Sequence, residues 1–292
     1  MTRVLVTGAD GIIGRAVSER LLAQGYQVTA LSLSYSGAHP ADRVLEGDAT
    51  SVADVARALD GADALAHFAA IPHPSLGTPY DVFRVNTDST FNVLSQAGER
   101  GIGRAVIASS INAIGYPNNP HDVLPPSFPL DESTVPDIAD AYSLSKLVDE
   151  RTAALAHRRW GVDVIALRFP LVKWPHVLEE VRAEISDDPG RLVREGWSYL
   201  TMADAARAVQ CALESDARGA QVIALSARDT LLDTPSAELL RRWAPQVPVT
   251  APIVGRQSLV DTSRARTLLG FEAAESIHDG SATPSPAALP AG

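Results

Sequence analysis

Tyr142 and Lys146 stand four residues apart in the stretch Tyr-Ser-Leu-Ser-Lys. An α-helix repeats every 3.6 residues, so a helix here places both side chains on one face, with the ammonium near the phenol. A tyrosine accepts a proton near neutral pH only if its pKa falls by about 3 units from an ordinary value near 10, and a neighbouring cation supplies about 1–3 of those units. The pair predicts acid–base chemistry. Because this spacing also arises by chance on amphipathic helices, the prediction depends on the surrounding elements.

A serine completes the candidate catalytic set. Ser110 follows the apolar stretch 105–109, which is typical of a buried strand, so its hydroxyl is expected where that strand ends. From there it could hydrogen-bond the reacting oxygen. We expect Tyr142 to accept or donate the proton, Lys146 to tune the phenol and anchor a ribose, and Ser110 to orient the substrate.

A glycine-rich turn near the N-terminus indicates the coenzyme. The turn follows the apolar run Val4-Leu5-Val6 and reads Thr7-Gly8-Ala9-Asp10-Gly11-Ile12-Ile13-Gly14. A helical run over 15–23 and a second strand over 27–31 complete the opening of a βαβ unit. Unpaired N–H groups at the start of such a helix bind a pyrophosphate. We therefore expect a nicotinamide dinucleotide, to or from which hydride passes.

The elements that position these residues alternate along the chain. Strand-like runs cover 4–7, 27–32, 44–46, 64–68, 105–109, 163–168 and 221–225, and helical patterns cover 51–59, 83–99, 203–214 and 263–269. This alternation predicts an α/β fold with a doubly wound parallel sheet, Rossmann-like, and a small C-terminal region that caps the substrate. We expect a single domain over 1–275. The expected capping segments lie around 170–200 and 226–262, with the proline-rich stretch 117–137 beside them, and 276–292 reads as a disordered tail.

Composition narrows the classes of partner. The chain has 292 residues and a net charge of −10, without a Lys/Arg cluster, so we expect a small-molecule substrate rather than nucleic acid or a membrane. A single cysteine, Cys211, excludes an intramolecular disulfide, and histidines at metal-ligand spacing are absent, so no metal is expected. With neither an apolar leader nor an apolar run of about 18 residues, the sequence predicts a cytoplasmic protein.

Further motifs follow the glycine turn in order: Gly47-Asp48, His67-Phe68-Ala69-Ala70, Asn86, Ser109-Ser110 and the Tyr142/Lys146 pair. In this order the chain resembles the extended short-chain dehydrogenases/reductases, the NAD-dependent epimerase/dehydratase family, over about residues 1–275. The resemblance implies that Asp48 contacts adenine, that Ala69 and Ala70 line the ribose and phosphates, and that the protein is a homodimer. The expected cofactor-binding residues are Gly8, Gly11, Ile12, Ile13, Gly14, Ser32, Asp48, Ala49, Phe68, Ala69, Ala70, Asn86, Ala108, Tyr142, Lys146 and Phe169.

The sequence departs from the pattern of this family at a position that affects the choice of coenzyme. The end of the second strand ordinarily carries an acidic residue that binds the ribose hydroxyls of NAD, and here that place holds Ser32. A small neutral residue tolerates the 2′-phosphate of NADP, although the nearest downstream arginine is only Arg43. The sequence leaves both coenzymes open and favours NADP.

Other departures concern the substrate. Family dehydratases carry Asp-Glu after the position of Ser110, whereas this chain carries Ile111-Asn112, which excludes that acid and base. Nucleotide-sugar epimerases carry an asparagine where this chain has Leu171. The chain after Leu171 is also short for enclosing a nucleotide-linked sugar, so a small alcohol or ketone fits better as the substrate. The compact length also resembles the uronate dehydrogenases, although Arg182 and Arg191 are carboxylate-binding candidates by charge alone. The expected substrate-binding residues are His73, Ser110, Ile111, Asn112, Tyr142 and Leu171.

Three functions remain open on this basis. The first is an NAD(P)-dependent oxidoreductase that interconverts a secondary alcohol and a ketone on a small, sugar-derived substrate. The second is an epimerase that retains its NAD and acts through a transient ketone. The third is a non-catalytic nucleotide sensor on the same fold, against which the complete Ser110, Tyr142 and Lys146 set argues.

Overall fold

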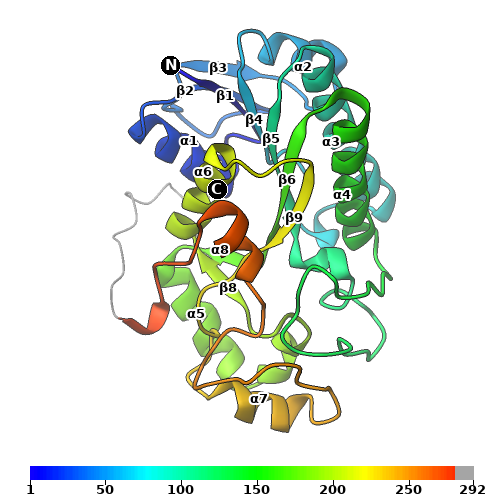
Figure 1. Ribbon diagram of the computed structural model, residues 1–292, viewed down its shortest axis with the longest axis vertical. Coiled ribbons are helices and arrows are strands. Elements are labelled where there is room, and N and C mark those ends of the chain that lie inside the picture. Colours follow the sequence, from blue (N-terminus) through cyan, green and yellow to red (C-terminus); the bar gives the residue numbers. More distant parts are fainter. Residues whose placement is uncertain (280–292) are drawn as a thin grey trace.

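The computed structural model describes residues 1–279 and has a seven-stranded parallel sheet at its centre (Figure 1). The strand order is β3-β2-β1-β4-β5-β6-β9. The strands are β1 (Arg3–Thr7), β2 (Gln27–Ser32), β3 (Arg43–Glu46), β4 (Ala64–His67), β5 (Arg104–Ser110), β6 (Asp163–Phe169) and β9 (Ala220–Ala224). The order reverses between β1 and β4, and ligands of doubly wound sheets bind at such a switch point, beyond the carboxyl ends of the strands.

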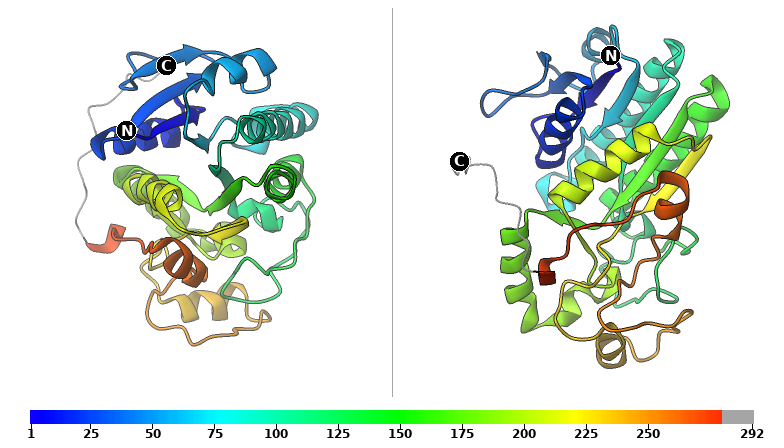
Figure 2. Two further views of the ribbon diagram at one scale, coloured as in Figure 1. Left: turned by 45° about the horizontal axis from the view of Figure 1, so that its top comes forward. Right: turned by 60° about the vertical axis from the view of Figure 1, so that its left-hand side comes forward.

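Helices cover both faces of this sheet (Figure 2). On one face α1 (Ile12–Ala23) packs against α6 (Met202–Glu214), and on the other α3 (Pro79–Glu99) packs against α4 (Ala141–Trp160) and α2 (Val52–Ala58). Strands buried on both faces need no polar alternation, which explains runs such as Val4-Leu5-Val6. No helix in the described part of the chain is long and apolar enough to cross a bilayer.

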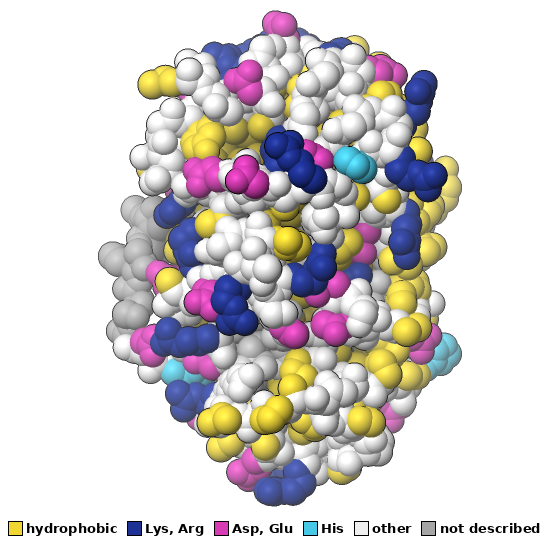
Figure 3. All heavy atoms as spheres, viewed as in Figure 1, with side chains coloured by type: hydrophobic (Ala, Val, Ile, Leu, Met, Phe, Trp, Pro, Cys, Tyr) yellow, Lys and Arg dark blue, Asp and Glu magenta, His cyan; other side chains and the backbone are white. Residues whose placement is uncertain are grey.

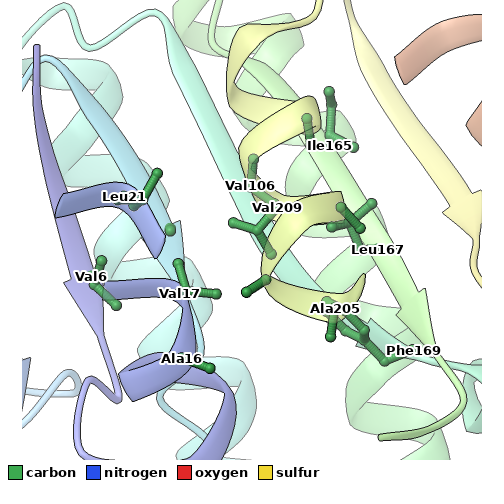
Figure 4. Packing of buried hydrophobic residues seen from close by; sticks show 14 of the residues in the cluster. Val6, Ala16, Val17, Leu21, Val106, Ile165, Leu167, Phe169, Ala205 and Val209 are labelled. Carbon is green, nitrogen blue, oxygen red and sulfur yellow. The ribbon is translucent and has the colours of Figure 1, made fainter. Parts of the chain in front are cut away.

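Small side chains set the packing on the α1/α6 face (Figure 4). Ala16 and Val17 of α1 and Ala205 and Val209 of α6 belong to one buried cluster with strand residues such as Val6. Alanines at the contact let the two helices approach each other and the sheet closely, at the density of a protein interior. The glycine turn at the start of α1 is thereby held rigidly against β1.

A smaller lobe lies beyond the carboxyl ends of β5 and β6 (Figure 1). It contains the two-stranded sheet β7 (Leu171–Lys173) and β8 (Tyr199–Thr201), and the helices α5 (Pro175–Ser186), α7 (Ser236–Trp243) and α8 (Ser263–Leu269) lie in or beside it. Single bridges join Phe128 to Val249 and Leu130 to Val260, so the proline-rich stretch becomes part of the lobe. Its core includes the fully buried Phe128, Trp197 and Tyr199. The segments expected to cap the site therefore pack together.

Most predicted elements are found within one to four residues of their expected ends, and α8 coincides with its prediction. The strands β7 and β8 and the helices α5 and α7 had been expected only as parts of capping segments. The expectation of a disordered tail from residue 276 does not hold for its first four residues, because Ser276 donates a hydrogen bond to Asp229 and a 3-10 turn covers Ile277–Asp279. Residues 280–292 lie outside the described part. On the face in Figure 3, charged side chains of both signs are interspersed.

Candidate active site

The predicted site residues converge at the carboxyl edge of the sheet. β1, β4, β5 and β6 are neighbours, and they end at Thr7, His67, Ser110 and Phe169. The glycine turn follows β1 directly, and the 3-10 turn Ile111–Ile114 follows β5. Sequence positions more than 150 residues apart are thus brought to one edge by strand register alone.

The glycine turn forms a cradle that side chains would fill. Gly8 has φ +64°, and a Cβ there would lie 2.6 Å from the nitrogen of Ala69. A Cβ on Gly14 would lie 2.2 Å from the carbonyl oxygen of Gly8. Gly11 caps α1 without a side-chain hydrogen bond, and Ile12 and Ile13 provide the first N–H groups of the helix. This open, positive helix end fits a dinucleotide pyrophosphate.

The expected adenosine side of the site is framed by α2 and α3. Asp48 is exposed, and its carboxylate accepts the N–H of Thr50, which leaves acceptor capacity for an adenine amino group. The carbonyl of the buried Ala49 accepts from Asn92. These contacts fix the loop after β3 at the sheet edge.

Asn86 acts through the backbone of its neighbours. Its Oδ1 accepts the N–H of Ile71 at 2.7 Å, and its Nδ2 donates to the carbonyl of Ile71 and to Ser145 Oγ at 3.0 Å. Because these bonds occupy both ends of the amide, Asn86 positions the stretch that begins Phe68-Ala69-Ala70 against α4. Asn86 thus joins the loop after β4 to α4.

α4 carries the Tyr142/Lys146 pair as the sequence predicts. Asp140 caps the helix by accepting the N–H of Ser143, so Tyr142 lies in the first turn, close to the sheet edge. The Lys146 Nζ lies 5.9 Å from the centre of the Tyr142 ring and donates to the carbonyl of Ala108 at 3.0 Å. No described residue hydrogen-bonds the Tyr142 hydroxyl. The phenol is thus close to a cation, and its hydroxyl has no hydrogen-bond partner among the described residues.

Asp149 joins this pair, and sequence reasoning missed it. Its Oδ2 lies 3.2 Å from Lys146 Nζ, and the side chains are 1% and 6% exposed, respectively. Burial alone would lower the pKa of Lys146, but Asp149, Tyr142 and Glu150 outweigh burial and the net pKa is raised. Lys146 is therefore a cation held in a fixed place. The i, i+3 spacing was a readable signal for this contact.

Ser110 and Asn112 form a second polar unit in the site. Ser110 Oγ accepts from both the backbone N–H and the Nδ2 of Asn112, each at 3.1 Å. Since both lone pairs are used, the Ser110 hydrogen is directed away from Asn112. Ser109 points to the opposite face, where it donates to Glu150, which also pairs with the buried Arg168. Of the two adjacent serines, the structure brings Ser110 to the site.

A buried histidine lies directly behind this edge. His67 Nδ1 is hydrogen-bonded to Thr7 Oγ1 at 2.6 Å and Nε2 to Thr90 Oγ1 at 3.2 Å. Burial, and then the charge of Lys146, lower the pKa of His67 to about 3. His67 is therefore a neutral packing residue, as expected from its strand end.

The other predicted site residues differ from one another in burial and in their contacts. Ile111 and Phe169 are buried at the strand ends, and Leu171 begins β7 at the base of the small lobe. His73 caps the 3-10 turn Pro74–Leu76 through Ser75 and is exposed. Ser32 ends β2, where its carbonyl accepts the N–H of Gly47.

A cavity of about 320 Å³ lies away from these residues. It is lined by residues that include Glu132, Glu150, Arg151 and Arg168, and neither Tyr142 nor the glycine turn contributes to it. Since Glu150 and Arg168 already pair with each other, we place the reaction at the sheet edge rather than here. No described group of His, Cys, Asp and Glu has the arrangement of a metal site.

Known proteins with similar sequences include sugar dehydrogenases. The chain is 29% identical over 228 residues to L-arabinose 1-dehydrogenase (NAD(P)(+)) of Haloferax volcanii, covering 74% of this chain and 84% of that one. It is 27% identical over 170 residues to uronate dehydrogenase of Pseudomonas putida, covering 57% and 60%. The chain spans 39% of the length of another relative, the uncharacterised Sinorhizobium fredii protein y4nG, to which it is 33% identical over 167 residues.

Solved structures and a family model agree on the fold. MoeE5 in complex with UDP-glucuronic acid and NAD superposes with a TM-score of 0.70 at 23% identity, covering 95% of this chain and 96% of that one. The model of the NAD-dependent epimerase/dehydratase family matches residues 4–224. With the glycine cradle, the strand-end serine and the Tyr142/Lys146 pair in one place, the chain belongs to the NAD-dependent epimerase/dehydratase family.

Proposed function

We propose that this protein is an NAD(P)-dependent oxidoreductase that interconverts a secondary alcohol and a ketone on a small, sugar-derived substrate. The observation that carries the proposal is the meeting of Tyr142, Lys146 and Ser110 beside the glycine turn. A nucleotide-binding sensor would need the turn but not a phenol beside a buried cation.

Each residue has a distinct task in this reaction. Ser110 donates its free hydrogen to the substrate oxygen and so fixes that oxygen beside Tyr142. In the oxidising direction Tyr142 takes the hydroxyl proton, and the fixed charge of Lys146 stabilises the phenolate. Gly8, Gly11 and Gly14 hold the dinucleotide, which supplies hydride acceptance when bound.

We infer the substrate class from the side chain of Asn112 beside Ser110 and from the relatives. Asn112 Oδ1 is buried and has no hydrogen-bond partner among the described residues, so it can accept from a second substrate hydroxyl. Aromatic side chains, among them Trp197 and Tyr199, fill the core of the small lobe. A polyhydroxylated monosaccharide or its acid suits this arrangement better than a nucleotide-linked sugar. The arabinose and uronate dehydrogenases among the relatives support the same class.

The test is turnover on free pentoses, hexoses and uronic acids, with UDP-sugars alongside. Reduced coenzyme is expected from at least one free sugar or sugar acid, and Tyr142→Phe is expected to abolish it. The matched control is Tyr26→Phe, which removes a hydroxyl that donates to Glu214, away from the site and from α3 and α4. An epimerase would instead release stoichiometric, non-exchanging NAD on denaturation and produce no net reduced coenzyme, and that outcome contradicts the proposal.

We also propose a homodimer formed through α3 and α4. The described surface of these helices exposes Tyr80, Phe91, Leu144 and Leu155, each at least 41% accessible. An apolar face of this kind marks an interaction site. Light scattering at the expected mass of two chains, and of one chain for Phe91→Glu, is the measurement.

A further inference from the structure

The loop that follows β2 folds back onto the glycine turn. Arg15 of α1 donates through Nη1 to the carbonyl of Ala38 at 3.1 Å. His39 Nε2 is hydrogen-bonded to the carbonyl of Ala9 at 3.1 Å. The N–H of Ser36 donates to Asp10 Oδ2 at 2.8 Å. The loop 33–42 is thereby attached to the turn at three points, beside the end of β2.

Asp10 is the centre of these contacts. Its Oδ1 lies 2.5 Å from Arg15 Nη2, and the two side chains are 14% and 19% exposed. Burial alone would raise the pKa of Asp10. The hydrogen bonds from Ser36 and Arg15 outweigh burial and hold this pKa below its ordinary value. The residue before it, Ala9, donates its N–H to Leu31, the neighbour of Ser32. An ionised carboxylate therefore lies in the turn that Ala9 joins to the end of β2, where the strand itself supplies only a serine.

The other basic side chains near this point are not free cations. Arg43, at the start of β3, donates to the carbonyls of Arg57 and Asp60, at the opposite edge of the sheet from the glycine turn. Burial lowers the pKa of His39, so it is uncharged at neutral pH. Arg15 is the remaining basic side chain, and Asp10 neutralises its charge. A 2′-phosphate would meet a carboxylate here and no unpaired arginine in the described loop and turn.

We propose that Asp10, paired with Arg15, selects the coenzyme, so that this protein binds NAD in preference to NADP. The neutral ribose hydroxyls of NAD can donate to a carboxylate, whereas the doubly charged 2′-phosphate of NADP is repelled by it. Asp10 does from the glycine turn what an acidic residue ordinarily does from the end of β2. This inference rests on the proposed function and reverses the preference that Ser32 alone suggested.

The experiment measures binding rather than turnover. Calorimetric titrations with NAD and NADP, and with 5′-AMP and 2′,5′-ADP as probes of the adenosine half, give the effect of the 2′-phosphate. We expect wild-type protein to bind the member of each pair that lacks the 2′-phosphate more tightly. Asp10→Ala frees Arg15, which binds phosphate in a forked geometry, so affinity for NADP and 2′,5′-ADP is expected to rise at least about tenfold.

Three further variants make the test specific. Asp10→Ala with Arg15→Ala is expected to lose that gain, because the guanidinium that grips the phosphate is gone. Asp10→Asn, of equal size, checks that charge and not volume is responsible. Glu238→Ala removes a carboxylate from an exposed Glu238/Arg241 pair on α7 and is expected to leave the preference unchanged. Thermal unfolding midpoints establish that each variant is folded.

The outcomes separate this inference from the proposed function. A wild-type preference for NADP, or a preference unaffected by Asp10→Ala and Asp10→Asn in folded protein, overturns the selection by Asp10 while leaving dehydrogenase activity in place. Failure of all four nucleotides to bind overturns both proposals. Selective NAD binding without turnover of any sugar supports the role of Asp10 and contradicts only the proposed reaction.

Discussion

Replacing Lys146 by methionine tests the electrostatics of the site most directly. The ammonium lies 5.9 Å from the centre of the Tyr142 ring. With an effective dielectric constant of about 20, a unit charge at this distance stabilises a phenolate by about 2.8 kcal/mol. This corresponds to a fall of about 100-fold in kcat/KM at a pH where the reaction requires the phenol to lose its proton. Because Asp149 offsets part of the charge, these values are upper limits.

The assay follows reduced nicotinamide during alcohol oxidation from about pH 6 to about pH 10, where a general base titrates. Saturating coenzyme removes any effect of Lys146 on ribose binding. We expect Lys146→Met to move the midpoint of the rate profile to higher pH. Asp149→Asn keeps the ammonium but removes its counter-charge, so it is expected to move the midpoint to lower pH. An unchanged midpoint in Lys146→Met, or shifts of the same sign in both variants, would refute the reasoning.

Measurements of unfolding free energy distinguish the loss of the Lys146 charge from damage to the fold. Lys146→Met leaves the carboxylate of Asp149 buried without its cation, which costs about 3–5 kcal/mol of unfolding free energy. The double variant Lys146→Met, Asp149→Asn removes both charges, so urea unfolding is expected to recover most of that loss. Its rate profile should nevertheless remain shifted relative to the wild type, because the cation beside Tyr142 is absent.

Three further predictions concern the frame of the site. Gly8→Ala places a Cβ 2.6 Å from Ala69 at a left-handed φ, so calorimetry should show a loss of at least about tenfold in coenzyme affinity. Burial lowers the pKa of His67 to about 3, so between about pH 6.5 and pH 3 only the unfolded chain binds a proton at this residue. The contribution of His67 to the unfolding free energy is therefore full above about pH 6.5 and falls by about 1.4 kcal/mol per pH unit towards pH 3. His67→Gln should flatten this loss between about pH 6.5 and pH 5 in urea titrations, and an equally steep loss would contradict it. Glu150→Gln breaks the buried pair with Arg168, so unfolding free energy should fall by about 3–5 kcal/mol while kcat is unchanged; a parallel fall in kcat would place Glu150 in the reaction.

Helix and strand periods predict that Tyr142, Lys146 and Ser110 come together, but they do not predict that Asp149 is buried beside them. The four-residue spacing placed Tyr142 and Lys146 together, and the strand before Ser110 placed it at the sheet edge. Asp149 lies on the same face of α4, yet a charged residue on a helix ordinarily faces solvent. It is buried because α4 packs against both α3 and the sheet, and helix periodicity does not reveal these tertiary contacts.

The loop contacts and the small lobe were beyond sequence reasoning for a related reason. β7 and β8 have three residues each, too few for a period to be recognised. The pairing of Asp10 with Arg15 and Ser36 depends on how the loop after β2 folds, and no local pattern encodes that path. The preference for NADP was drawn from Ser32 and from the distance of Arg43 along the chain, and it did not include a carboxylate from another element.

The end of the described chain has a consequence for how the protein is made. Ser276 donates to Asp229, and Tyr199, which begins β8, donates to that same carboxylate and accepts the N–H of Ile277. The glycine turn and the first five strands come from residues that leave the ribosome early. The contacts of Tyr199 and Asp229 with Ser276 and Ile277, in contrast, form only when residue 277 has emerged. A nascent chain can thus assemble the part with the glycine turn first, and the smaller lobe gains its contacts with residues 276–279 later.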